Sequence, residues 1–205
     1  MKALPELLLL RHAETEWNRE GRFQGALDSP LTEQGREQAA ALGAVLSGLG
    51  VTPGTHAALT SPQGRARATA RIALGPLGVP VGEDERLAEI GMGAWTGLRR
   101  AEIDARWPGP DAEPILDFYA RCPDGEAVAA VASRAGAVLA GLDRPTIIVT
   151  HGITLRVLCA LALGRDLTEA GAITIPQGSL ARVAGHRFEV VSPQAGGLRA
   201  IHASG

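Results

Sequence analysis

Residues 7–18 read LLLLRHAETEWN, and the expected fold follows from this stretch. Four consecutive leucines stop at Arg11 and His12, where the chain becomes polar. A short apolar run with this ending is typical of a strand that is buried on both faces of a sheet. Ligands of open α/β sheets bind at the carboxyl ends of such strands, so we expect Arg11 and His12 in a binding crevice. The alternative is an ordinary strand end with two solvated charged side chains.

A second stretch has the same design. Residues 146–150 read TIIVT, a β-branched run that ends at His151 and Gly152. Two of the five histidines therefore follow directly on a buried-strand pattern. If the two strands are neighbours in a parallel sheet, His12 and His151 converge over one crevice.

Strand-like and helix-like segments alternate along the rest of the chain. Strands are expected at residues 56–60 and 79–81, with two or three more between 173 and 191. Helices are expected where apolar residues recur every three or four positions, over residues 32–49, 66–74, 126–142 and 154–163. This alternation predicts an α/β fold, a three-layer sandwich with a mostly parallel central sheet and helices on both faces.

No linker or repeat divides the chain, so residues 1–205 are expected to form a single domain. Three prolines, Pro108, Pro110 and Pro114, interrupt the segment at about 99–121. Because proline breaks regular helices, this segment is expected to be a peripheral insertion of short helices. The tail at residues 192–205 is expected to be loosely held.

Composition argues against several classes of protein. A net charge of −2 and a pI near 6.2 argue against a nucleic-acid-binding surface, which is normally basic. No apolar segment approaches the length of a membrane span, and residues 7–10 are too short for a signal peptide. The two cysteines, Cys122 and Cys159, lack the spacing of a disulfide framework or a zinc site. A cytoplasmic protein without nucleic-acid or membrane partners is therefore expected.

Two histidines close to arginines favour phosphate chemistry over metal binding. A metal site would combine imidazoles with carboxylates, and positive arginines would repel the ion. Phosphate oxygens instead suit planar guanidinium groups, which bind them bidentately. Arg11 and Arg65 each lie in a loop just after an expected strand and are the candidates. Neither a metal nor a cofactor is expected.

Four sequence blocks, in this order, resemble the histidine phosphatase superfamily, the phosphoglycerate-mutase-like proteins. They span most of the chain and are residues 11–18 (RHAETEWN), 61–66 (SPQGRA), 87–89 (LAE) and 150–152 (THG). Further stretches resemble the small phosphatase branch, namely residues 25–32 (GALDSPLT), 93–98 (GAWTGL) and 123–126 (PDGE). The chain departs from the pattern at Ala13, where the family most often has glycine.

The resemblance implies a role for each matching residue. His12 would be the nucleophile that becomes phosphorylated, and Glu89 would exchange a proton with the leaving alcohol and then with water. Arg11, Arg65 and His151 would surround the phosphoryl oxygens, with His151 as a cation. Further substrate-binding groups would be Asn18, Gln24, Gly25 and Gly152. Without the resemblance, Glu89 would be interpreted as a solvated loop carboxylate and Arg65 as a surface charge at a helix start.

Three alternatives to a metal-independent phosphatase for small organic phosphate monoesters stay open. A phosphoglycerate mutase would share the fold, but residues 89–100 (EIGMGAWTGLRR) lack the aromatic and the lysine that mutases place there. A non-catalytic phosphate-binding domain would not need the nucleophile, and a metallohydrolase would be inhibited by a chelator.

The substrate and the oligomeric state also stay open. A small phosphorylated metabolite is expected as the partner: a sugar phosphate, a cobalamin-pathway phosphate, a phosphoglycerate or a broad set. Four side chains would either line the substrate rim or simply pack under the insertion: Met92, Trp95, Trp107 and Phe118. A homodimer is compatible with such a small α/β enzyme.

Overall fold

Strand β1 (Leu7–Arg11) forms from the leucine run and lies inside a seven-stranded sheet. β4 (Thr146–Thr150) pairs with β1 in parallel, in a register that sets Arg11 beside Thr150. The two strands that precede His12 and His151 are therefore neighbours. The computed structural model describes residues 4–194 and 197–201, and within these the strand order is β3-β2-β4-β1-β5-β6-β7.

The sheet has a parallel half and an antiparallel half. β3 (Val81–Glu83), β2 (Ala57–Thr60), β4 and β1 run parallel, as predicted. β5 (Leu180–Ala184), β6 (Arg187–Gln194) and β7 (Gly197–Ile201) continue the sheet in antiparallel pairing. The turn between β5 and β6 contains Gly185 with a φ of +60°, a backbone conformation that suits a tight hairpin.

The C-terminal segment differs from the loose attachment expected for it. β6 continues through residues 192–194, and β7 pairs with β6 over residues 197–201. The backbone ladder holds this segment to the sheet, and the apolar pattern of the sequence does not reveal such pairing. Residues 195–196 and 202–205 of the expected tail lie outside the described residues.

The leucine run is continuous because β1 has a hydrophobic layer on each side. Leu7 and Leu9 pack into the core on one face of the sheet, and Leu8 and Leu10 pack into the core on the other. All four side chains are buried, with at most 1% exposure. Each fully buried leucine contributes about 1.5–3 kcal/mol of hydrophobic stabilisation.

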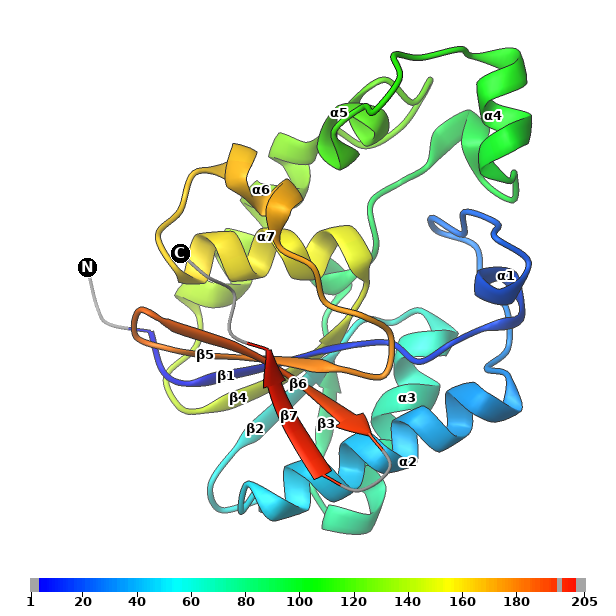
Figure 1. Ribbon diagram of the computed structural model, residues 1–205. Coiled ribbons are helices and arrows are strands. Elements are labelled where there is room, and N and C mark those ends of the chain that lie inside the picture. The colour runs from blue at the N-terminus through cyan, green and yellow to red at the C-terminus, as the bar shows by residue number, and fades with distance from the viewer. Residues whose placement is uncertain (1–3, 195–196, 202–205) are drawn as a thin grey trace.

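Helices cover both faces of the sheet and complete the three-layer sandwich (Figure 1). α2 (Glu33–Gly48) and α3 (Gly64–Leu74) lie on one face, where they cover Leu8 and Leu10. α6 (Val128–Ala140) and α7 (Gly152–Ala162) lie on the other face, over Leu7 and Leu9. The fold class predicted from the alternating pattern is confirmed.

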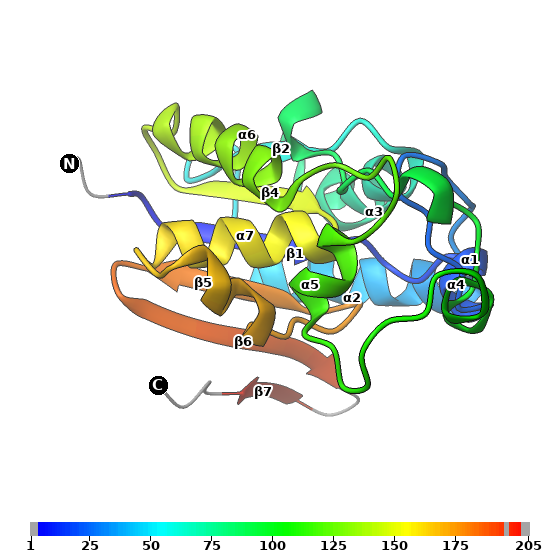
Figure 2. The ribbon, with the colours of Figure 1, turned by 90° about the horizontal axis from the view of Figure 1, so that it is seen from above.

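The remaining helices and turns are short. They are α1 (Glu16–Arg19), η1 (Gly75–Leu77), η2 (Glu85–Leu87), η3 (Gly93–Trp95), α4 (Arg100–Arg106), α5 (Ile115–Ala120) and η4 (Leu167–Ala172). The short helices α4 and α5 fall in the proline-rich segment where they were predicted. Figures 1 and 2 both place α1 and α4 at the end of the sheet where β1 ends. The peripheral segment therefore lies close to the predicted binding crevice.

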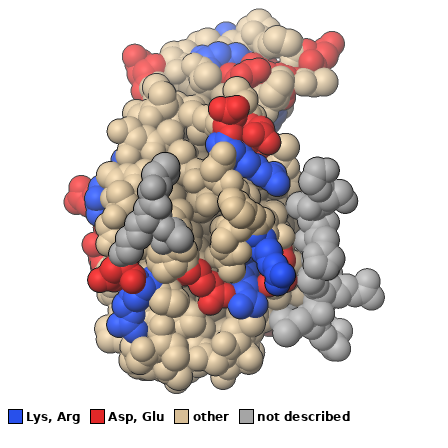
Figure 3. All heavy atoms as spheres, turned by 90° about the vertical axis from the view of Figure 1, so that its left-hand side faces the viewer, with Lys and Arg blue, Asp and Glu red and all other residues tan. Residues whose placement is uncertain are grey.

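The opposite end of the molecule carries acidic and basic side chains side by side (Figure 3). This mixture agrees with the small net charge of −2. Among the helices of the described residues, none has the length and apolar character that crossing a membrane requires.

Candidate active site

His12 and His151 meet at the carboxyl ends of β1 and β4. Their ring centroids are 5.1 Å apart, and both rings are almost fully buried. The backbone N–H of His12 donates to the carbonyl of Thr150 at 2.8 Å, so the parallel ladder itself brings the two residues together. The predicted convergence of the two imidazoles is confirmed.

A cavity of about 280 Å³ opens at this place. Eight of the nine site residues predicted from the sequence line it, and the ninth, His151, lies behind His12 and Arg65. The lining residues are Arg11, His12, Asn18, Gly21, Arg22, Phe23, Gln24, Gly25, Arg65, Glu89, Met92, Tyr119 and Gly152. The β1 end, the loop around Gly25, the start of α3 and the Glu89 loop therefore converge on one space.

His12 is held as a neutral imidazole. Its Nδ1 lies 2.8 Å from the carbonyl oxygen of Ala13, which accepts the Nδ1 proton and leaves Nε2 unprotonated. Burial holds the pKa of His12 well below its usual range, and the nearby cations of Arg65 and Arg11 lower it further. A neutral ring with one free nitrogen is the form of histidine that can act as a nucleophile.

Arg65 is buried to 2% exposure and almost saturated with acceptors. Nη1 donates to the carbonyl of Leu27 at 2.7 Å and to Asp28 Oδ1 at 3.0 Å. Nη2 donates to the carbonyl of Gly25 at 3.0 Å, and Nε donates to His151 Nδ1 at 3.2 Å. A guanidinium group has five N–H bonds, so one on Nη2 stays available for a ligand.

The protonation state of His151 differs from the cationic form expected for it. Its Nδ1 accepts from Arg65 Nε, and its Nε2 donates to Ser61 Oγ at 2.7 Å, a pattern that only the neutral ring can make. Burial holds the pKa of His151 well below its usual range, and Arg65 and then His12 lower it further. The guanidinium occupies the place where a second ring proton would have to be, so His151 is neutral in this structure.

Arg11 lines the cavity and has one buried N–H without a partner among the described residues. Nη1 donates to the carbonyl of Ile175 at 3.2 Å, whereas the buried Nε finds no acceptor within the described part of the chain. Burial lowers the pKa of Arg11, and the charge of Glu89 partly opposes this. A buried guanidinium N–H without a partner is costly unless an anion binds there.

Glu89 lies across the cavity at the start of α7. Oε1 accepts hydrogen bonds from the backbone N–H groups of Ile90, Ile153 and Thr154 at 3.0–3.2 Å. The helix N-terminus favours a negative group at this position. A Cβ built on Gly152 would lie 3.5 Å from Glu89 Oε2 and 3.6 Å from Arg11 Nη2, so the carboxylate and the guanidinium flank one narrow space.

The remaining predicted binding residues shape the loop around the cavity. Asn18 Oδ1 accepts from Gln177 Nε2 at 2.7 Å, and the side chain of Gln24 bonds to Thr15 Oγ1 at 2.9 Å. Gly25 directs its carbonyl toward Arg65, with a φ of +51°. The side-chain oxygen of Asn18 and the side chain of Gln24 are thus engaged within the protein.

Several site residues were not predicted. Gln63 joins two loops, because its Nε2 donates to the Gly25 carbonyl at 2.7 Å and its Oε1 accepts from the Glu89 N–H at 2.8 Å. Asp28 accepts from the backbone and the side chain of Arg65. Both belong to quoted motifs, but nothing in their spacing reveals these partners. Phe23 and Tyr119 line the cavity from loops whose folding the pattern does not specify.

Of the four proposed rim residues, only Met92 lines the cavity. Trp95 and Phe118 are buried, with their ring centroids 4.6 Å apart. Trp107 lies 6.3 Å from Trp95 by the same measure. The packing alternative therefore holds for these three aromatic side chains.

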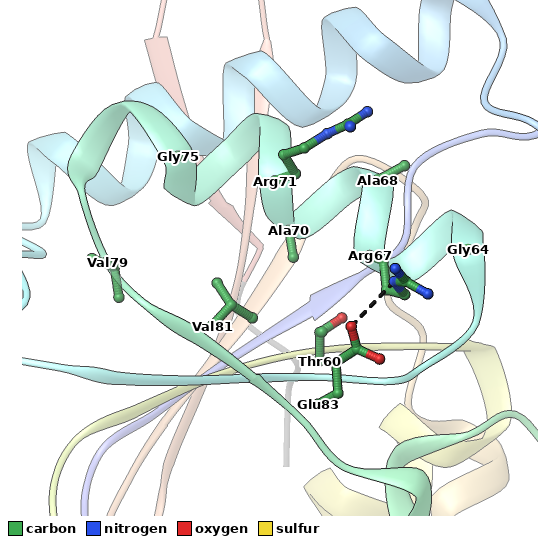
Figure 4. Close-up of a pocket in the computed structure, with 10 residues that line it drawn as sticks. All are labelled: Thr60, Gly64, Arg67, Ala68, Ala70, Arg71, Gly75, Val79, Val81 and Glu83. Carbon is green, nitrogen blue, oxygen red and sulfur yellow. Dashed lines mark ion pairs between the residues drawn. The ribbon is translucent and has the colours of Figure 1, made fainter.

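A larger hollow of about 520 Å³ lies between α3 and the edge strand β3 (Figure 4). Its lining carries the ion pair of Arg67 and Glu83, with 3.2 Å between Nε and Oε1. No histidine lines it, and its arginines are exposed. The chemistry-bearing groups are gathered in the smaller cavity.

The chain resembles known proteins in sequence. The model of the histidine phosphatase superfamily (branch 1) matches residues 7–192. A protein of Citrobacter koseri named probable phosphoglycerate mutase GpmB is 34% identical over 189 residues, which cover 87% of this chain and 84% of that protein.

Solved structures also resemble the whole chain. A mycobacterial glucosyl-3-phosphoglycerate phosphatase in complex with VO3 has a TM-score of 0.78 and 31% identity, covering 98% of this chain and 100% of that one. YhfR of Bacillus stearothermophilus has a TM-score of 0.68 and 30% identity, covering 97% of this chain and 96% of that one.

Proposed function

Because the chain belongs to the histidine phosphatase superfamily (branch 1), we propose that it hydrolyses phosphate monoesters of small organic alcohols through a phosphohistidine on His12. The observation that carries this proposal is the neutral His12, whose Nδ1 is bound to the Ala13 carbonyl beside two buried arginines. A nucleophile and a set of phosphate-binding donors share one cavity.

The reaction has two steps. His12 Nε2 attacks phosphorus while the bond to the alcohol oxygen breaks, and Glu89 delivers its proton to that oxygen. A water molecule then attacks the phosphohistidine and gives its proton to Glu89, so that phosphate leaves and His12 is neutral again. The terminal N–H groups of Arg11 and the remaining Nη2–H of Arg65 bind the phosphoryl oxygens, whose charge they stabilise in both transition states.

His151 serves this reaction through Arg65. Its Nδ1 accepts from Arg65 Nε and so fixes the plane of the guanidinium group beside His12. The pKa of His151 rises when a phosphate dianion enters, because the negative charge offsets the two arginines.

The leaving group lies against Phe23, Met92 and Tyr119 in a cavity of about 280 Å³. This volume fits a small metabolite, since drug-sized ligand pockets start at about 300 Å³. Phosphoglycerate and its glycosylated derivatives are the substrate classes to test first, because similar proteins are named for them.

The test compares the wild type with His12→Ala and His56→Ala on p-nitrophenyl phosphate in the presence of EDTA. We expect turnover by the wild type that EDTA does not reduce, and a loss of more than about 10³-fold for His12→Ala. His56 lies outside the cavity and is the matched control, for which full activity is expected. Turnover by His12→Ala, or inhibition by EDTA, would contradict the proposal.

A phosphoglycerate mutase is the second candidate, favoured by the 34% identity to the GpmB protein. Incubation with 3-phosphoglycerate separates the two activities. A phosphatase releases inorganic phosphate at least as fast as any isomer forms, whereas a mutase forms 2-phosphoglycerate in large excess over free phosphate.

A further inference from the structure

Glu89 lies in a segment without regular secondary structure, between η2 and η3. A general acid must nevertheless keep its carboxyl group within about 0.5 Å of its working position. The backbone on either side of Glu89 is held by side chains from other elements, and one pair of them lies outside the cavity.

Arg134, in the middle of α6, binds the chain just before Glu89. Its Nη1 donates to the carbonyl of Ala88 at 2.6 Å and to the carbonyl of Arg86 at 2.7 Å. Its Nε and Nη2 donate to the two carboxylate oxygens of Glu126 at 2.8 and 3.0 Å. The planar guanidinium thus joins α6, the Glu126 carboxylate and the Glu89 loop in one rigid arrangement.

Glu126 binds the chain just after Glu89. Oε2 accepts from the N–H of Gly91 at 3.1 Å, and the backbone N–H of Glu126 donates to the Gly91 carbonyl at 2.9 Å. A Cβ built on Gly91 would lie 3.3 Å from Glu126 Cβ, so the two backbones are in close contact. Residues 88 and 91 are therefore both fixed to a single ion pair.

The ion pair of Glu126 and Arg134 is anchored to the core through α6. Val131 and Ala135, on the same helix as Arg134, are completely buried against the sheet. The side chains of Arg134 and Glu126 are only 17% and 27% exposed. Neither residue lines the cavity, so any effect on the reaction passes through the Glu89 loop or through the charge of Arg134.

We propose that Glu126 and Arg134 are positioning residues that set the place of the Glu89 carboxyl group, an inference that rests on the proposed function. His12 and Arg65 are delivered by β1 and α3 and make no hydrogen bond to this pair. Loss of the pair should therefore impair proton transfer by Glu89 and leave nucleophilic attack by His12 largely intact.

The leaving group makes this distinction measurable. p-Nitrophenolate departs without a proton, whereas glycerol must receive one as its bond to phosphorus breaks. The constant kcat/KM covers the steps up to the phosphohistidine, so Glu89 affects it as the acid that protonates the leaving group and not as the base of the later hydrolysis. Glu89→Gln provides the reference, with a large loss on β-glycerophosphate and a small one on p-nitrophenyl phosphate.

For Arg134→Met we expect kcat/KM to fall about 10- to 100-fold on β-glycerophosphate and less than about 3-fold on p-nitrophenyl phosphate. The double variant Glu89→Gln/Arg134→Met should be no slower than Glu89→Gln, because the two changes remove one function. Glu126→Gln keeps the shape of the side chain and should show the same selectivity with a smaller loss.

Two controls separate positioning from charge and from folding. The charge of Arg134 also lowers the pKa of His151. Arg134→Lys keeps this cation but loses the planar fork, so it should resemble Arg134→Met if position matters. Arg182→Met removes another partly buried ion-pair arginine, on β5, and should slow neither substrate.

An equal loss on both substrates, or a double variant clearly slower than Glu89→Gln, would overturn the positioning role. Full activity of Arg134→Lys would overturn it as well, since charge alone would then suffice. If Glu89→Gln itself shows no dependence on the leaving group, the proposed acid role of Glu89 fails instead, and the positioning role fails with it.

Discussion

At the scale of single residues, the two arginines act on the site in two ways. Arg11 and Arg65 present N–H donors to an anion, and the same charges suppress protonation of His12. Under the proposed function, the cations that bind phosphate therefore also keep His12 in the neutral form that a nucleophile requires. This coupling leads to a prediction about pH.

We expect kcat/KM to stay high well below pH 6.5, the usual pKa of histidine. The folded-state pKa of His12 is lowered, so the ring accepts a proton only at a more acidic pH than a free histidine. A profile measured from pH 4 to 8 with p-nitrophenyl phosphate checks this. The Arg11→Met variant should be slow. The acidic limb of its pH profile should move toward higher pH, because the loss of one cation raises the pKa of His12. A wild-type limb centred at 6.5 would contradict the assignment.

Gly25→Ala tests the loop that faces Arg65. The added Cβ would lie 2.9 Å from Met92 Cβ, on a backbone with a φ of +51°. We expect the Gly25 carbonyl to leave Arg65, with a fall in kcat/KM of about 10- to 100-fold. Gly50→Ala is the matched control, since φ is +74° there and nothing lies within 4 Å of the added atom. Both variants should lose about 1–2 kcal/mol of stability, but only Gly25→Ala should lose activity.

At the scale of secondary-structure elements, a strand end and a helix share the task of placing His12. Thr69 on α3 accepts from the N–H of Ala13 at 3.0 Å and donates to the Arg65 carbonyl at 2.8 Å. One buried hydroxyl thereby ties the end of β1 to the helix that carries Arg65. This contact therefore helps to fix the position of His12 relative to Arg65.

Thr69→Val keeps the shape of the side chain and removes the hydroxyl. We expect a loss of about 1–3 kcal/mol in the free energy of unfolding, because the buried Ala13 N–H loses its acceptor. kcat should fall as well, because His12 is no longer fixed relative to Arg65. Thr146→Val is the control, since its buried hydroxyl donates only to the Arg144 carbonyl at the far end of β4. Urea denaturation and steady-state kinetics measure both effects, and equal activity of the two variants would contradict the link.

The position of a site residue within the secondary-structure elements decides whether the sequence alone predicts it. Arg11, His12 and His151 were predictable because buried parallel strands end at a common edge, and the apolar runs mark those strands. Arg134 was not, because its contacts are with backbone carbonyls 46 and 48 residues away in the chain. Tyr119 reaches the cavity only through the irregular path of the insertion. The neutral state of His151 follows from a hydrogen bond to Arg65 that no spacing reveals.

At the scale of the whole molecule, the chain buries two neutral histidines within one sandwich. The sheet class was predictable from the leucine run, since successive side chains of a strand buried on both faces pack into opposite cores. The antiparallel half of the sheet was harder to predict from the sequence, because β7 follows no apolar pattern and is fixed by backbone pairing. The fold thus isolates His12 and His151 from solvent, and this isolation has a thermodynamic consequence.

Stability should fall as the pH drops below 6.5. In the unfolded chain both histidines take up a proton near pH 6.5, whereas burial and the arginines keep them neutral in the folded protein to a much lower pH. The unfolded state then binds more protons, so each histidine removes up to about 1.4 kcal/mol per pH unit between 6.5 and its lowered native pKa.

Urea denaturation at half-unit steps from pH 7.5 to 4.5 measures this slope. The variant His12→Gln/His151→Gln retains every carboxylate of the wild type, so the difference in slope between the two proteins isolates the histidines. We expect the wild type to be steeper by up to about 2.7 kcal/mol per pH unit. Sulfate, which stays a dianion over this pH range, should reduce the wild-type slope because a bound anion raises both native pKa values, and it should leave the variant's slope unchanged. Parallel slopes for the two proteins without sulfate would show that the imidazoles are not held neutral by the folded chain.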